Sequence, residues 1–140
     1  MDVDRLSAGV ELDILVADKV MGWPLLEEGA LRPQTDFVQM VIEPTPLSGK
    51  QFVLTHWRWD GKGHVWSRFN PSVSLGAAMG VVAKILARES KPNFFLEFVE
   101  ESWRCHFGRS RPWIEQPPYA PHAETAPLAI CRATLREVTG

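Results

Sequence analysis

Two amphipathic segments near opposite ends of the chain constrain its fold most. Between residues 6 and 21, apolar side chains recur at spacings of three and four, which places them on one side of a helix. These side chains are Leu12, Leu15, Val16 and Val20, with Ala8 one turn earlier. Gly22 and Pro24 end this helix, because proline lacks a backbone donor and its ring clashes with the preceding turn. A helix with one apolar side needs a layer to pack on.

The C-terminal segment predicts a second helix, with Thr125 as its N-cap and Pro127 in the first turn, where no backbone donor is needed. Its core stripe is Leu128, Cys131, Leu135 and Val138. A third helix is expected after residues 70–71, with Ser72 as its cap. Its buried side is predicted to carry Leu75, Met79, Val82 and Leu86, with Ala78 and Ile85.

The segments between these helices have the composition of β-strands. Residues 37–42 and 51–59 are rich in β-branched and aromatic side chains, and 64–66 follow a turn at 60–63. Residues 94–99 and 103–107 alternate as a hairpin. The sum predicts one α+β domain over residues 1–140, a small antiparallel or mixed β-sheet layered with three α-helices.

Composition narrows the class of protein. The net charge of −2 argues against a disordered chain or a nucleic-acid coating protein. Residues 1–43 hold nine acids and three bases, net −6, and the remainder holds eight acids and twelve bases, net +4. The folded surface is therefore either polarised or neutralised by pairing between the two parts. No secretion signal and no apolar run of about 18 residues occurs, so we expect a cytoplasmic protein without a membrane span.

Four blocks of the sequence resemble a known family. They are residues 12–23, the helix entry at 70–72 with Val81 and Val82 inside the helix, the 94–107 hairpin with its central Trp103, and residues 125–133. They are similar to the phage ABA sandwich domain family, small proteins of bacteriophages and prophages. The resemblance implies a sheet between layers of helix and a phage origin, while the family's molecular role is largely unassigned. Residues 31–68 are longer than the family pattern and carry Trp and Arg side chains.

Catalytic and metal motifs are not recognisable in the sequence. Four histidines and the two cysteines lack the paired spacing of a tetrahedral zinc site, so no metal and no cofactor is expected. No nucleophile elbow and no phosphate-cradling loop occurs. Cys105 and Cys131 fall on apolar faces and are predicted to be core residues, not a disulfide or a nucleophile.

The remaining candidates combine aromatic with cationic side chains. Guanidinium groups bind phosphate, indole rings stack on bases, and Trp with Arg is the usual composition of protein interface anchors. The predicted ligand- or partner-binding residues are Trp57, Arg58, His64, Trp66, Arg68, Arg104, His106, Arg109, Arg111 and Trp113. The alternative is that Trp23, Trp59 and Trp103 fill the core while the arginines are solvated.

These residues favour a phage-encoded, non-enzymatic accessory protein in the cytoplasm of a host bacterium. It would bind and sequester or inhibit a host factor in counter-defence, either a host defence protein or a nucleotide signal molecule. Surplus aromatic residues also suggest a homo-oligomer. One alternative is an enzyme acting on a phosphate-bearing small molecule, with His56, His64 or His106 as general base. Another is a nucleic-acid-binding protein, which the weak net charge disfavours.

Overall fold

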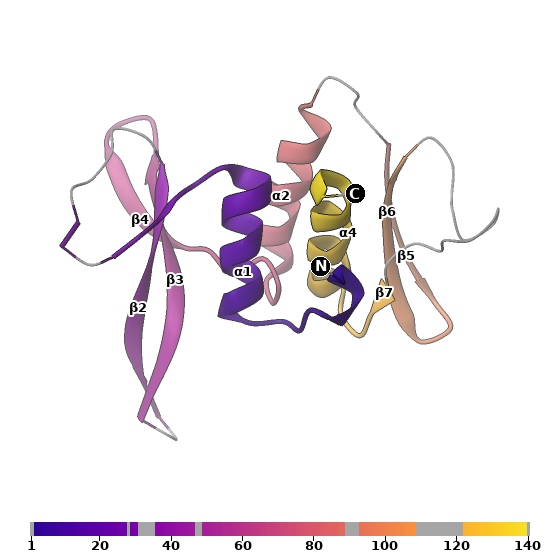
Figure 1. Cartoon of the computed structure of the whole chain (residues 1–140), viewed down its shortest axis with the longest axis horizontal. Helices are drawn as coiled ribbons and strands as arrows, with labels where there is room; N and C mark the ends of the chain where they lie inside the picture. Colours follow the sequence, from indigo (N-terminus) through magenta and orange to yellow (C-terminus); the bar gives the residue numbers. More distant parts are fainter. Residues whose placement is uncertain are drawn as a thin grey trace.

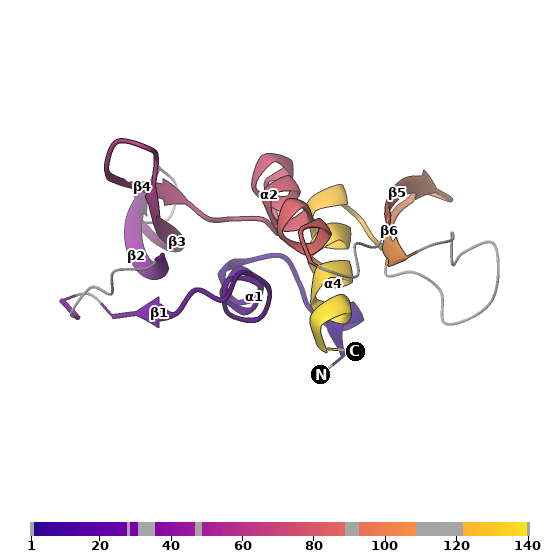
Figure 2. The same cartoon turned by 90° about the horizontal axis from the view of Figure 1, so that it is seen from above.

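A layer of helices lies between two β-sheets in the computed structural model (Figure 1). The structure describes residues 2–27, 29–30, 36–46, 49–88, 93–108 and 122–139. The same order of layers is visible from above in Figure 2. The predicted α+β class with three helices and a mixed sheet is confirmed. The second hairpin forms a sheet of its own beyond the helices, so the helical layer is covered on both sides.

The elements follow the predicted order along the chain. The helical elements are the 3₁₀ turn η1 (Val3–Arg5), α1 (Val10–Val16) with its π-helical continuation η2 (Ala17–Met21), α2 (Leu75–Leu86) and α4 (Ala126–Thr139). The first sheet has the order β1 (Leu25–Leu26), β2 (Phe37–Thr45), β3 (Gly49–Trp59), β4 (His64–Arg68), with β1 parallel and the others antiparallel. The second sheet is antiparallel, with the order β5 (Asn93–Val99), β6 (Ser102–Gly108), β7 (His122–Ala123).

Helix α4 is the central element of the core. It contacts α1, α2, η1 and η2 on one side and β6 and β7 on the other. Its predicted stripe is confirmed at Leu128, Cys131 and Leu135, but Ala129 and Ile130 are also fully buried. A helix that is apolar around most of its circumference is typical of an internal helix. One cluster of buried residues accordingly joins the helices to both sheets.

The ends of two helices are set by local side chains. Gly22 adopts a left-handed conformation (φ 74°) and ends the first helix, as predicted. The Thr125 hydroxyl accepts a hydrogen bond from the Leu128 N–H at 3.3 Å, which confirms the predicted cap of α4. The predicted cap of α2 was wrong. Ser74 caps α2 by accepting from the Ala77 N–H, whereas the fully buried Ser72 ties this segment to α1.

The buried side of helix α2 overlaps the predicted one in part. Ala78, Val82 and Ile85 are buried as predicted, and Val81 is buried with them. Leu75 and Met79, both expected in the core, are 48% and 42% exposed. Both stripes have helical spacing, so periodicity alone did not distinguish them.

Side chains of the first sheet alternate between a helix-facing and an outward-facing side. Val38 and Leu54 belong to the core cluster and therefore face the helices. Phe37, Thr55 and Trp57 lie on the opposite side, because successive residues of a strand point to opposite faces. The outward side of β2, β3 and β4 carries the candidate functional site.

Candidate functional site

Four aromatic rings gather on the outward side of the first sheet. We call Phe37, Trp57, His64 and Trp66 the aromatic face. Trp57 lies directly opposite Trp66 in the β3–β4 register, with ring centroids 4.9 Å apart. The His64 ring stacks on Trp57 at 5.1 Å and an interplanar angle of 6°. Trp66 is 40% exposed while Phe37 is 1% exposed, so the face offers an indole above a closed aromatic floor.

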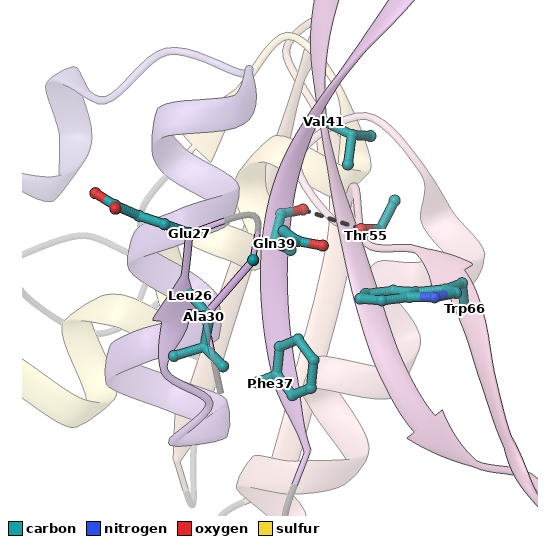
Figure 3. A pocket seen from close by; sticks show the side chains of 9 residues that line it. Leu26, Glu27, Ala30, Phe37, Gln39, Val41, Thr55 and Trp66 are labelled. Carbon is teal, nitrogen blue, oxygen red and sulfur yellow. Dashed lines mark hydrogen bonds between the residues drawn. The ribbon is translucent and has the colours of Figure 1, made fainter. Parts of the chain in front are cut away.

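A cleft of about 380 Å³ opens beside this face (Figure 3). It is lined by Leu26, Glu27, Gly29 and Ala30 on one side and by Phe37, Gln39, Val41, Thr55 and Trp66 on the other. The Thr55 hydroxyl donates to the main-chain oxygen of Gln39 at 3.0 Å. Figure 3 shows the Glu27 carboxylate directed away from Thr55 and Trp66. Within the described ranges the lining includes no Arg and no Lys, so this part of the cleft suits an apolar or neutral polar group.

The predicted cations that the structure describes do not gather at this cleft. Arg68 extends from β4 and forms an ion pair with Glu43 of β2, with both side chains partly exposed. Arg58 lies on the opposite side of the sheet from Trp57, and its Nε donates to the Ser67 hydroxyl at 3.2 Å. Arg136 of α4 pairs with Asp4 at 2.7 Å. Bases of the later part of the chain therefore neutralise acids of the first part at these sites, which supports the second of the two charge interpretations.

The other predicted site residues belong to a different part of the molecule. Arg104 and His106 lie in β6 of the second sheet, beyond the helices (Figure 1). The Arg104 guanidinium is 3.4 Å from the Glu100 carboxylate. Arg109, Arg111 and Trp113 lie outside the described residues. The structure thus groups Trp57, His64, Trp66 and Arg68 and separates them from Arg104 and His106.

His56 is the buried histidine of the first sheet. It is 7% exposed and faces the helices, where the Trp23 ring stacks on it at 3.6 Å. Its Nε2 is 3.1 Å from the Asp36 carboxylate. Burial lowers the pKa of His56, and the bond to Asp36 opposes this shift. An imidazole covered by an indole in this way is a packing residue, which weakens its candidacy as a general base.

The lowered pKa of His56 predicts a loss of stability on acidification. The unfolded chain takes up a proton near pH 6.5, whereas the folded chain resists protonation of this ring. The free energy of unfolding should therefore fall as the pH drops below about 6.5. We expect His56→Gln to reduce this fall, measured by urea denaturation at about pH 7.5 and about pH 5. The exposed His64→Gln is the control, and an equal pH response of wild type and His56→Gln would contradict the assignment.

The comparison with protein families agrees with this architecture. The family model of the phage ABA sandwich domain matches residues 14–135. The chain belongs to this family. Comparisons with curated proteins and with solved structures found no match. The matched range includes α2, most of α4, both sheets and the aromatic face, so the site lies within the phage ABA sandwich domain.

Both cysteines of this phage ABA sandwich protein are buried. Cys105 and Cys131 are free thiols with no exposed surface, and burial raises the pKa of both well above the usual range. They pack in the core, as predicted. Residues 2–27, 29–30, 36–46, 49–88, 93–108 and 122–139 contain no group of three His, Cys, Asp or Glu that could hold a metal ion. The same residues form no helix that is long and apolar enough to span a membrane.

Several residues of the phage ABA sandwich site were not predicted from the sequence. Phe37, Gln39 and Thr55 line the cleft but carry no motif. The alternation of side chains along β3 places Thr55 on the same side as Trp57, so the sequence could have predicted this residue. The register of β2 against β3, which pairs Phe37 with Trp57 and Gln39 with Thr55, depends on long-range contacts. Trp59 shares this side, and at 59% exposure it does not fill the core as the alternative interpretation proposed.

Proposed function

We propose that this phage protein is a non-enzymatic binder that docks a host protein on the aromatic face and thereby sequesters or inhibits it. The observation that carries the proposal is the 40% exposed Trp66 beside a cleft that is lined by no cation among the residues that the structure describes. Half-exposed indoles beside a recess are the usual anchors of protein interfaces. A phage protein of this kind acts inside the infected cell, and a host defence protein in the cytoplasm is the partner we favour.

A protein partner suits the cleft better than a nucleotide signal. Phosphate groups are held by guanidinium forks, ammonium groups or clustered backbone donors. The nearest predicted cation on this side, Arg68, is already paired with Glu43. The Gln39 and Thr55 side chains offer neutral polar groups instead. The cleft therefore favours an apolar side chain of a partner, with the Trp57 and Trp66 rings packing around it.

Enzymatic and nucleic-acid alternatives have less support. His56 is covered by Trp23, and the contacts of His64 among the described rings are with Trp57 and Trp59. Direct nucleic-acid binding needs a cationic surface. Arg58, Arg68 and Arg104 do not form one, because they contact Ser67, Glu43 and Glu100 at three separate places.

The test compares wild type with two variants of the cleft in extracts of the host bacterium. Trp66→Ala removes the exposed indole, and Ala30→Trp fills the cleft from an exposed residue at its edge. We expect the wild-type protein to retain a host protein and each variant to weaken the binding by about thirtyfold or more, as for an interface anchor. The dissociation constant is then measured with the purified partner.

Phe98→Ala is the matched control, because Phe98 is 57% exposed on the second sheet and its removal deletes a similar apolar area. It should bind the partner as wild type does. Equal retention by wild type and Trp66→Ala would overturn the proposal. So would a nucleotide, released intact on denaturation, in place of a retained protein. Release of a chemically altered nucleotide would favour the enzymatic alternative.

A further inference from the structure

The β2–β3 hairpin extends beyond the helices that cover the rest of the first sheet (Figure 1). Ile42 and Phe52 lie opposite each other in its register and are 56% and 57% exposed. Strand β4 pairs with residues 55–59 of β3, and β1 pairs with residues 38–39 of β2. The far half of the hairpin is therefore a two-stranded ribbon, and no other strand among the described residues covers either of its edges.

The hydrogen bonds of β3 show which main-chain groups lie on its free side. The Phe69 N–H donates to the Leu54 carbonyl at 2.8 Å, so the main-chain groups of Leu54 point away from β2. This direction alternates along an antiparallel strand, so the N–H and C=O groups of Phe52 and Lys50 point to the same side. We call these groups the open edge of β3, because within the described residues they have no hydrogen-bond partner. Unpaired groups of this kind are a template for another strand.

A groove of about 210 Å³ runs along the open edge of β3. It lies between residues 51–54 of β3, the start of α1 at Gly9 and Val10, and Val73 in the segment before α2. The register would place Pro71 opposite Phe52, but proline has no N–H to donate, and β4 ends at residue 68. The groove therefore occupies the place in the sheet that a longer β4 would have filled.

The other edge of the ribbon is protected against pairing. The Val38 N–H donates to the Pro24 carbonyl at 3.0 Å, so the same alternation turns the main-chain groups of Ile42 and Pro44 away from β3. Pro44 has no N–H to offer there, and proline on an edge strand is a usual protection against the addition of another strand. Residues 49–59 of β3 contain no proline. Only one of the two edges is thus suited to accept a strand.

We propose that the open edge of β3 binds an extended segment of a partner protein, which adds to the first sheet as a further strand. Main-chain hydrogen bonds to Phe52 hold the segment, as in other cases of strand addition. Its side chains point alternately to the two faces of the sheet. One set contacts Phe52, Val10 and Val73 and should be apolar. The other set lies on the side of Gln51 and Arg68 and should be polar.

A second copy of this chain fits the open edge less well than a free segment. Pairing of β3 with β3 about a two-fold axis would bring Val10 and Val73 of both copies over the same pair of strands. A free extended segment brings no helices of its own. The open edge also differs from the aromatic face, where Trp57 and Trp66 lie on the outward side of β3 and β4. Its existence does not depend on the proposed function.

The probe for the test is a displayed library of random peptides of about eight residues, the length of an ordinary strand. Selection on Trp66→Ala keeps the contribution of the aromatic face low. We expect the selected peptides to alternate apolar and polar residues. The most frequent peptide is then synthesised and added to the wild-type protein. It should slow hydrogen exchange of the Phe52 amide at least about tenfold, because this amide gains a hydrogen bond, and leave the Ile42 amide unchanged.

Phe52→Pro removes the N–H from the open edge and should weaken binding of the same peptide at least about tenfold. Ile42→Pro is the matched control, because it removes an equally exposed apolar side chain and an N–H from the other edge of the ribbon. It should bind the peptide as wild type does. The melting temperatures of both variants show whether the ribbon tolerates the two prolines equally.

Four results would overturn the proposal. They are a selection that enriches no peptide, peptides without the alternation, a Phe52 amide that the peptide does not protect, and equal binding by the two proline variants. A wild-type dimer that Phe52→Pro dissociates would also overturn it, because a second copy would then occupy the edge. Exchange of the Phe52 amide is measured on the wild-type protein, so the outcome does not depend on how well the variants fold.

Discussion

Replacement of Phe37 by alanine should lower the free energy of unfolding by about 3 to 5 kcal/mol, the range expected for a fully buried phenylalanine. Phe37 is 1% exposed although it lies on the outward side of the first sheet. The Trp66 ring meets it edge-on at 5.6 Å, and the Trp57 ring lies at 6.4 Å. Its removal would leave a cavity under both indoles. The midpoint and slope of urea denaturation measure the loss.

Two control variants test whether the loss of stability comes from the buried Phe37 ring. Phe37→Leu should recover most of the lost stability, because it restores apolar volume without the ring. Phe98→Ala, at a residue that is 57% exposed, should cost less than about 1 kcal/mol. A loss below about 1 kcal/mol for Phe37→Ala would mean that the ring is not enclosed as described.

Replacement of Asp13 by alanine should destabilise the protein by about 2 to 3 kcal/mol, because it leaves a buried donor without an acceptor. The Asp13 carboxylate is in α1, is 4% exposed and accepts a hydrogen bond from the Ser72 N–H at 2.8 Å. The Ser72 hydroxyl in turn accepts from the Gly9 N–H at 3.0 Å. These bonds join the start of α1 to the segment before α2, so both helices should lose protection in hydrogen exchange.

Asp13→Asn is the informative comparison, because the amide oxygen can still accept from Ser72. Burial raises the pKa of Asp13, and its hydrogen bonds with Ser72 oppose this shift, so the folded chain binds the proton more tightly than the unfolded chain does. The stability that Asp13 contributes is present at low pH and is lost as the pH rises through its folded-state pKa. The wild-type protein should therefore lose stability relative to Asp13→Asn as the pH is raised from about 4 to about 7. A constant difference would contradict the burial of the carboxyl.

Local signals predicted the elements, whereas the order of layers depended on long-range contacts. The alternation of residues 94–107 predicted the β5–β6 hairpin, and Thr125 with Pro127 predicted the start of α4. Neither signal says which sheet a hairpin joins. Ala129 and Ile130, which are buried against the remaining sides of α4, were the hint that this helix lies between two layers. A stripe analysis that assumes one buried side cannot use that hint.

The candidate site could be predicted only in part, because local signals do not show which residues meet across the fold. Trp57 and Trp66 were expected to bind a partner, and the structure brings them together on one side of β3 and β4. Arg104 was assigned to the same group by composition, but it lies in the second sheet. Residues with similar side chains need not lie near one another in the folded protein. Phe37, which closes the floor of the cleft, could be placed there only once the register of β2 was known.

Hydroxyl-radical footprinting of the protein, alone and with a host protein captured as proposed above, tests the proposed binding role of the aromatic face most directly. In the complex, oxidation of Trp66 and Trp57 should fall sharply, while oxidation of the exposed Phe98 on the second sheet should not change. Unchanged oxidation of Trp66 in the complex, or protection confined to Phe98 and its neighbours, would contradict this account.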